Sequence, residues 1–189
     1  MNQAGRVIWI TGLSGAGKST LAALLQHALQ QAGQAVILLD GDEVRSVMPL
    51  GDRFDREARL ALALSYGRLC RLLALQNYTV ICATISMRAE VYAWNRQNLP
   101  GYIEVFLDVP ARLRAARDPK RYYARLENEG LGDFAGHDQA VDEPPSPDLR
   151  LVPEESESPR ESLSRILALI AAREGAAQDQ ARAADQARV

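Results

Sequence analysis

A phosphate-binding pattern, G-x-x-x-x-G-K-S, is the clearest sign of chemistry in this sequence. Its residues are Gly12-Leu13-Ser14-Gly15-Ala16-Gly17-Lys18-Ser19, followed by Thr20. The glycines let backbone N–H groups point into one hollow, where the N-terminus of a following helix adds partial positive charge. In this pattern the lysine reaches the β- and γ-phosphates of ATP and the serine hydroxyl binds Mg²⁺. We therefore expect an ATP site here; a glycine-rich turn without function is the alternative.

Two carboxylates, Asp40 and Asp42, follow an apolar run at residues 35–39. A carboxylate at such a strand end can hold Mg²⁺-bound water or accept a proton from an attacking hydroxyl. A simple Asp-Gly turn is the alternative, but the phosphate loop upstream favours a functional role. Arg45, three residues beyond Asp42, either faces the same cleft or lies solvated on the surface.

A basic segment lies beyond the fourth apolar run. Its cations are Arg112, Arg114, Arg117, Lys120, Arg121 and Arg125. From about residue 117 to residue 147 the apolar periodicity fades, and charges, glycines and prolines dominate. We expect a lid at 117–147 whose cations close over phosphates, because phosphoryl transfer needs charge stabilisation and exclusion of water. A solvated helix face is the alternative.

Two phenylalanines lie outside the apolar runs. Phe54 is surrounded by charged residues, and Phe134 lies between Asp133 and Ala135-Gly136 in the irregular segment. Isolated aromatic residues usually belong to the core, but these polar surroundings favour exposed faces on which a ring could stack. No Ser-His-Asp or Cys-His arrangement emerges from the sequence.

Apolar runs of strand length alternate with segments of helical periodicity. The runs at 6–10, 35–39, 79–85 and 102–107 predict buried strands, and 149–152 predicts a short last strand. This alternation is typical of an α/β domain with a parallel sheet covered on both faces. Ligands of such sheets bind beyond the carboxyl ends of the strands, where the phosphate loop and the carboxylates are expected.

Length and charge bound the remaining possibilities. The chain has 189 residues and a net charge of −2, so nothing predicts attraction to nucleic acid or to a membrane. We expect one domain over residues 1–175 and a frayed or disordered tail at 176–189, which lacks large apolar residues. The two cysteines, Cys70 and Cys82, are predicted to be core residues. Together with an N-terminus unlike a signal peptide, they favour a cytoplasmic location.

At this point the sequence resembles the adenylylsulfate kinase (APS kinase) family. Besides the phosphate loop, the matching pieces are Leu39-Asp40-Gly41-Asp42 with Val44-Arg45, Ile85-Ser86, Arg117-Asp118-Pro119-Lys120 with Tyr122, Phe134-Ala135-Gly136, and Glu143-Pro144-Pro145 with Pro147. They occur in family order between residue 6 and about residue 152. The resemblance implies the P-loop NTPase fold: three αβα layers around a mostly parallel five-stranded sheet, with a lid segment.

The resemblance also implies an activity and a role for each matching residue. The family transfers the γ-phosphate of ATP, with Mg²⁺, to the 3′-hydroxyl of adenosine 5′-phosphosulfate (APS), giving PAPS for sulfate assimilation. Asp42 matches the general base, and Asp40 matches a supporting carboxylate that would share Mg²⁺ with Ser19. The acceptor-binding residues implied are Asp40, Arg45, Phe54, Arg59, Lys120 and Phe134. Ser86 falls at the family's phosphoserine position, although direct transfer needs no such intermediate.

Three departures from the family pattern leave alternatives open. Leu62 replaces a usual Asn, Ser86-Met87-Arg88-Ala89 replaces Ser-Pro-Tyr/Phe-Arg, and Asp142-Glu143 replaces Tyr-Glu. A kinase of the same type with another small hydroxyl acceptor therefore remains an alternative. A regulatory nucleotide-binding NTPase is a third, which the lid and the paired aromatics disfavour. The expected partners are small-molecule substrates, with a homodimer as one option for assembly.

Overall fold

The computed structural model describes residues 5–48, 55–116, 141–154 and 157–186 of the chain. Within these ranges strands and helices alternate as the apolar pattern predicts. In chain order the elements are β1 Arg6–Thr11, α1 Lys18–Gln31, β2 Val36–Asp40, α2 Gly41–Val47, α3 Arg56–Ala74, β3 Thr79–Ala83, α4 Ala89–Asn98, β4 Ile103–Leu107, α5 Ala111–Ala116, β5 Leu149–Leu151 and α7 Pro159–Gln186. All the expected strands are present, including the short β5.

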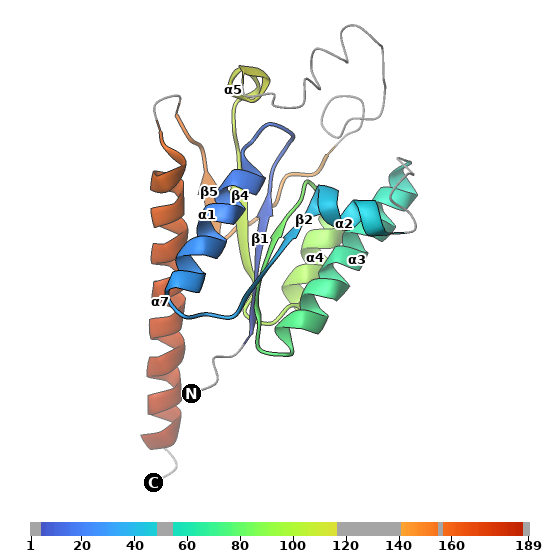
Figure 1. Cartoon of the computed structure of the whole chain (residues 1–189). Coiled ribbons are helices and arrows are strands. Elements are labelled where there is room, and N and C mark those ends of the chain that lie inside the picture. The colour runs from blue at the N-terminus through green and yellow to red at the C-terminus, as the bar shows by residue number, and fades with distance from the viewer. Residues whose placement is uncertain (1–4, 49–54, 117–140, 155–156, 187–189) are drawn as a thin grey trace, which may run out of the picture.

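The strands form one five-stranded sheet in the order β2-β3-β1-β4-β5. Every neighbouring pair in it is parallel. β1 therefore lies at the centre, and all the strands end at the same edge (Figure 1). This confirms the predicted P-loop NTPase architecture and places the loop after β1 at the same edge of the sheet as the end of β2.

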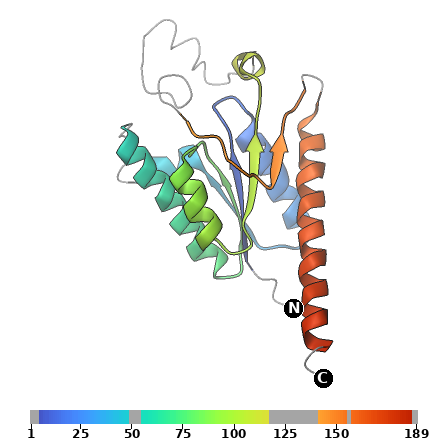
Figure 2. The same ribbon diagram turned by 180° about the vertical axis from the view of Figure 1, so that it is seen from behind.

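Helices cover both faces of the sheet, which makes three layers. α1 and α7 lie on one face, and α3 and α4 lie on the other (Figures 1 and 2). Alternate residues of β1 serve the two cores: Ile8 and Ile10 pack with α1 and α7, whereas Val7 and Trp9 pack with α3. All of β1 is buried, because both of its faces are covered.

The short helix α2, which the sequence analysis did not predict, begins at the carboxylate pair. Asp40 is its N-cap: the backbone N–H of Asp42 donates to Asp40 Oδ1 at 2.9 Å. An aspartate in this role satisfies one of the donors that a helix leaves free at its start. The backbone that would have made a plain Asp-Gly turn thus continues as a helix, and Asp42 lies in its first turn.

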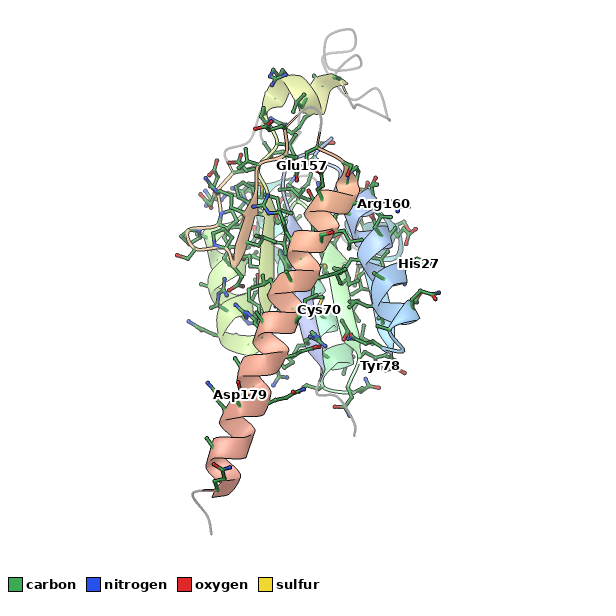
Figure 3. All side chains as sticks on the ribbon, turned by 90° about the vertical axis from the view of Figure 1, so that its left-hand side faces the viewer. His27, Cys70, Tyr78, Glu157, Arg160 and Asp179 are labelled. Atoms are coloured by element: carbon green, nitrogen blue, oxygen red, sulfur yellow. The ribbon has the colours of Figure 1, made fainter. Side chains whose placement is uncertain are left out.

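The residues after Gly175, expected to form a frayed or disordered tail, are helical up to Gln186. α7 begins with Pro159, with the Ser158 backbone N–H donating to Glu161 Oε2 at 2.6 Å, and it continues to Gln186 as a single helix. Figure 3 shows α7 running past the rest of the molecule, with Asp179 on the protruding part. The residues after Gly175 are mostly Ala, Gln and Arg, which are strong helix formers and sustain the helix without a core.

Candidate functional site

The phosphate loop joins the end of β1 to the start of α1, as its motif requires. Gly17 is the N-cap of α1 and has a left-handed backbone, with φ 90°. Gly15 has φ 76°, and a Cβ added there would lie 2.7 Å from the carbonyl oxygen of Arg114. Only glycine fits both positions without strain. The loop is therefore shaped by its glycines to close over the N-terminus of α1, where an anion is stabilised.

The two polar residues of the motif, Lys18 and Ser19, lie where the loop meets α1. Lys18 Nζ donates to the Leu13 carbonyl oxygen at 2.9 Å, so its ammonium group lies over the loop itself. Ser19 Oγ donates to Asp40 Oδ2 at 2.5 Å. The structure thus joins the loop to the end of β2, two strands away in the sheet.

The pair formed by Ser19 and Asp40 suits Mg²⁺. Both groups offer oxygen, the ligand that this ion prefers, and they converge from different strand ends. Mg²⁺ in phosphoryl-transfer sites keeps water and phosphate oxygens as its other ligands, so one or two protein oxygens suffice.

Asp42 and Arg45 both project from α2. Asp42 is exposed in the first turn, and Arg45 is half-buried in the last turn. Val44 anchors the helix in the core beneath α3. Arg45 is therefore only partly exposed, and it lines the pocket described next.

A pocket lies between α2, α3 and the segment that follows β3. Its lining residues are Arg45, Arg59, Leu62, Ala63, Tyr66, Thr84, Ile85, Ser86, Met87, Arg88 and Val141. Three of these side chains are guanidinium groups and none of the described lining residues is acidic. Such a pocket attracts an anionic ligand. The apolar residues Leu62, Met87 and Val141 form the rest of its wall.

Tyr66 is a pocket residue that the sequence analysis missed. Its hydroxyl donates to the carbonyl oxygen of Gly41 at 2.9 Å. Burial raises the pKa of Tyr66 above its ordinary value, and the nearby Arg45 guanidinium opposes the rise by charge and by hydrogen bonding. The helical periodicity of α3 identifies Tyr66 as an inward-facing residue, but no sequence signal identifies the partner of its hydroxyl.

Ser86 lies in the pocket with an unusual backbone. Its φ of 33° is in the left-handed region, where non-glycine residues are strained. Its Oγ lies 2.8 Å from Thr84 Oγ1. The Ile85 carbonyl oxygen, between the two, accepts a hydrogen bond from the Thr11 hydroxyl on β1. Hydrogen bonds on both sides of the strained residue thus hold this turn against the sheet.

Asp142 joins the far end of the expected lid segment to the pocket. Its Oδ2 accepts a hydrogen bond from the Ala89 backbone N–H at 3.1 Å, at the start of α4. Its own backbone N–H donates to the Met87 carbonyl oxygen at 3.1 Å. The pocket wall formed by Met87 and Val141 is therefore held from two directions. Sequence reasoning noted Asp142 only as a departure from a family pattern.

Several predicted site residues cannot be placed. Phe54, Lys120 and Phe134, with most of the proposed lid, lie outside the described residues.

Both cysteines are buried free thiols in the core, as expected. Within the described ranges, the helices lack the combination of length and apolar character that crossing a membrane requires.

Comparison with known proteins gives a consistent family. A family model described as adenylylsulphate kinase matches residues 4–152. An adenylyl-sulfate kinase of Deinococcus deserti is 40% identical over 147 residues, which cover 78% of this chain and 81% of the relative. A cytidine diphosphoramidate kinase of Campylobacter jejuni is 35% identical over 139 residues, covering 73% of this chain and 81% of the relative.

A solved structure of an APS kinase has the same fold. It is the enzyme of Mycobacterium tuberculosis in complex with AMPPNP and APS, and its TM-score to this chain is 0.82. The two are 32% identical, and the match covers 89% of this chain and 98% of the other. The similarity therefore extends over the whole of that enzyme and includes the part of the chain that carries the loop, α2 and the pocket.

Proposed function

The chain belongs to the adenylylsulphate kinase family, and we propose that it transfers the γ-phosphate of ATP to the 3′-hydroxyl of APS, giving PAPS and ADP. One observation carries the proposal: Ser19 of the phosphate loop meets Asp40 at the start of α2, beside a pocket with three guanidinium groups. A nucleotide triphosphate on the loop and an anionic acceptor in the pocket would then meet at α2.

Each of these residues has its own role in the proposed reaction. Asp42 accepts the proton of the acceptor hydroxyl, whose oxygen forms the new bond to the γ-phosphorus as the bond to the bridging oxygen of ADP breaks. Lys18 stabilises the charge that develops on the transferring group, and the N–H groups of the loop bind the phosphates. Ser19 and Asp40 would hold Mg²⁺, which neutralises charge on the β- and γ-phosphates when bound.

The acceptor assignment rests on charge and on relatives. APS carries a phosphosulfate, and the pocket offers Arg45, Arg59 and Arg88 without a described acidic lining residue. The M. tuberculosis relative was solved with APS. Phe54 and Phe134, as an adenine-stacking pair, and Lys120, near the substrate, complete the proposed acceptor site.

A second acceptor is favoured by the apolar wall of the pocket. Leu62, in the place of the family's usual Asn, is buried and lines the pocket together with Met87. Neither side chain can hydrogen-bond to a purine in the way an amide does. One of the relatives is a cytidine diphosphoramidate kinase. The alternative acceptor is therefore a cytidine nucleotide, with the same phosphoryl-transfer chemistry.

An acceptor screen with γ-labelled ATP and mass spectrometry of the products tests the proposal. Labelled PAPS is expected from APS. If APS does not react and a cytidine nucleotide becomes labelled, the acceptor is the cytidine nucleotide and not APS. Slow ATP hydrolysis that ignores every acceptor would indicate a regulatory NTPase instead. The variant Leu62→Asn is expected to raise kcat/KM for APS, because it restores a hydrogen-bonding group to the pocket wall.

The location and extent of the enzyme follow from the same proposal. A cytoplasmic location is supported by the two free thiols, Cys70 and Cys82. We propose residues 1–175 as the kinase domain, with 117–147 as its lid, and ATP and the acceptor as its small-molecule partners. A homodimer remains the proposed assembly, and size measurement in solution tests it.

A further inference from the structure

Tyr66 connects α3 to the helix that carries the proposed base. Its side chain is 2% exposed, and its hydroxyl donates to the Gly41 carbonyl oxygen at 2.9 Å. Gly41 is the residue between Asp40 and Asp42. Tyr66 and Arg45 line the same pocket, and the Arg45 guanidinium opposes the rise that burial causes in the Tyr66 pKa. The phenol oxygen is thus bonded to the backbone at the start of α2 and lies within the electrostatic influence of Arg45 in its last turn.

The helix α2 is short and only partly buried. It spans Gly41–Val47, lies beside β2 and α3 (Figure 1), and contributes Gly41 and Val44 as its buried residues. Asp40 caps its first turn from within the same segment. A helix this short gains little stability from its own hydrogen bonds. Its position therefore depends on contacts with neighbouring elements, of which the Tyr66 hydroxyl is a directional one.

The start of α2 is also packed tightly against the end of β3. A Cβ added at Gly41 would lie 3.0 Å from Thr84 Oγ1 and 3.1 Å from the Ala83 carbonyl oxygen. The close approach limits how far Gly41 can move toward the sheet, and the hydrogen bond from Tyr66 limits how far its carbonyl can turn away. Together these contacts fix the backbone from which Asp42 projects.

We propose that Tyr66 is a positioning residue of this kinase: its hydroxyl holds the Gly41 carbonyl at the start of α2, and thereby aligns the helix that carries Asp42 and Arg45 with the acceptor. The inference rests on the proposed function, because the alignment matters only if α2 carries the base and an acceptor-binding arginine. Small misplacements of such groups reduce turnover strongly.

Steady-state kinetics of Tyr66→Phe test the proposal. The variant keeps the ring and its packing and removes only the hydroxyl. We expect kcat/KM for the acceptor to fall about 5-fold, the change that corresponds to losing one hydrogen bond between neutral groups. The fall should be divided between a lower kcat and a higher acceptor KM, while KM for ATP stays within about twofold, since the Tyr66 hydroxyl bonds to α2 and its side chain lines the acceptor pocket.

Tyr102→Phe is the matched control. Tyr102 is also a buried tyrosine, and its hydroxyl donates to Glu104 Oε1 at 2.7 Å, at the opposite end of the sheet from α2. Its loss should lower the melting temperature and leave all kinetic constants near wild type. If Tyr66→Phe behaves in the same way, with a lower melting temperature and unchanged kinetics, its role is structural and the proposal is overturned.

A double-mutant cycle with Arg45→Ala identifies the route. If Tyr66 acts on the acceptor through Arg45, the rise in acceptor KM caused by Tyr66→Phe should disappear once Arg45 is absent. An undiminished rise would contradict that route. Turnover by the wild type tests the proposed function separately. Calorimetry then compares the dissociation constant of the acceptor between variant and wild type, and this comparison does not depend on turnover.

Discussion

Asp40 bonds to both the phosphate loop and the backbone of Asp42, the proposed base. One carboxylate oxygen of Asp40 accepts from Ser19 and the other from the Asp42 backbone N–H. Asp42 is exposed in the first turn of α2, where it is accessible to an acceptor hydroxyl. We therefore propose separable roles for the two carboxylates, with Asp40 organising the loop and Asp42 acting as the base.

Asp42→Asn is expected to lower kcat by roughly 10²–10⁴-fold, the typical contribution of a general base. The side chain keeps its shape, so ATP binding and the melting temperature should hardly change. Titration with a fluorescent ATP analogue and steady-state turnover measure the two quantities. Asp40→Asn is the comparison, and if it lowers kcat more while ATP binding is retained, the two roles are reversed.

Ser86 tests whether the phosphoryl group passes through the protein. We expect Ser86→Ala to retain turnover within about 10-fold, because direct transfer from ATP needs no phosphoserine and the loss is one hydrogen bond to Thr84. Rapid-mixing experiments with γ-labelled ATP should leave no label on the wild-type protein. Label on the protein, together with an inactive alanine variant, would establish a covalent intermediate.

At the scale of the elements, the predictable parts are those with a repeated apolar pattern. The strands β1 and β3 are buried on both faces, and their continuous apolar runs identify them from sequence alone. The seven-residue α2 has too little periodicity to be recognised, and its Asp-Gly start is equally typical of a turn. The sequence therefore points to Asp42 as the proposed base, but it does not predict the helix that carries this residue.

Long-range contacts explain what else the sequence could not supply. The Tyr66 hydroxyl bonds to a residue 25 positions away, Asp142 bonds to residues 50 or more positions away, and the Glu104 backbone N–H bonds to Asp148, 44 positions away. Only the folded sheet brings these groups together. Leu62 illustrates the same limit. The family pattern marked it as a departure, and only the structure places it in both the core cluster and the pocket wall.

A buried polar network joins β4 to α4 and α7. Glu104 Oε2 accepts a hydrogen bond from Arg96 at 3.0 Å, and Glu104 Oε1 accepts one from Tyr102 at 2.7 Å. Asp148 pairs with both Arg96 and Arg173. Burial raises the pKa of Glu104, although the Tyr102 hydroxyl and the Arg96 guanidinium oppose the rise. The network therefore makes stability depend on pH.

The pH dependence has a definite sign. With a raised pKa in the folded state, Glu104 holds a proton at pH values where the unfolded chain has lost it, so the free energy of unfolding falls as pH rises from 4.5 to the raised pKa. In urea unfolding, the stability of the wild type minus that of Glu104→Gln should decrease over this window. An increase would mean that the ion pair with Arg96 outweighs burial.

Glu143→Gln is the control for this measurement. Glu143 also pairs with an arginine, Arg150, but its side chain is 59% exposed. An exposed pair contributes little and is screened by salt. The corresponding stability difference should therefore stay nearly constant over the same pH range, which separates the effect of burial from the effect of removing a carboxylate.

At the scale of the whole molecule, α7 has two parts with different roles. Up to Glu174 it is attached to the sheet: Arg173 donates to the Tyr102 carbonyl oxygen at 2.9 Å, and Glu174 pairs with the buried Arg6 at the start of β1. Ile166 and Ile170 are buried in the core that α7 shares with α1. Beyond Gly175 the described side chains are exposed.

Two truncations should separate these parts. A chain ending at Gly175 removes only the protruding part, and we expect its free energy of unfolding to change by less than about 0.5 kcal/mol. A chain ending at Ala171 also removes Arg173 and Glu174, which leaves Asp148 and Arg6 without those partners at the sheet. Its expected loss is about 1–3 kcal/mol, because partly buried charges lose their hydrogen bonds. Urea unfolding of both chains, with turnover measured in parallel, makes the comparison.

The chain ending at Gly175 should also retain full activity, since it includes the whole proposed kinase domain. Equal losses of stability, or a loss of turnover on removal of the protruding part alone, would assign residues 176–186 a place in the folded core or in the site.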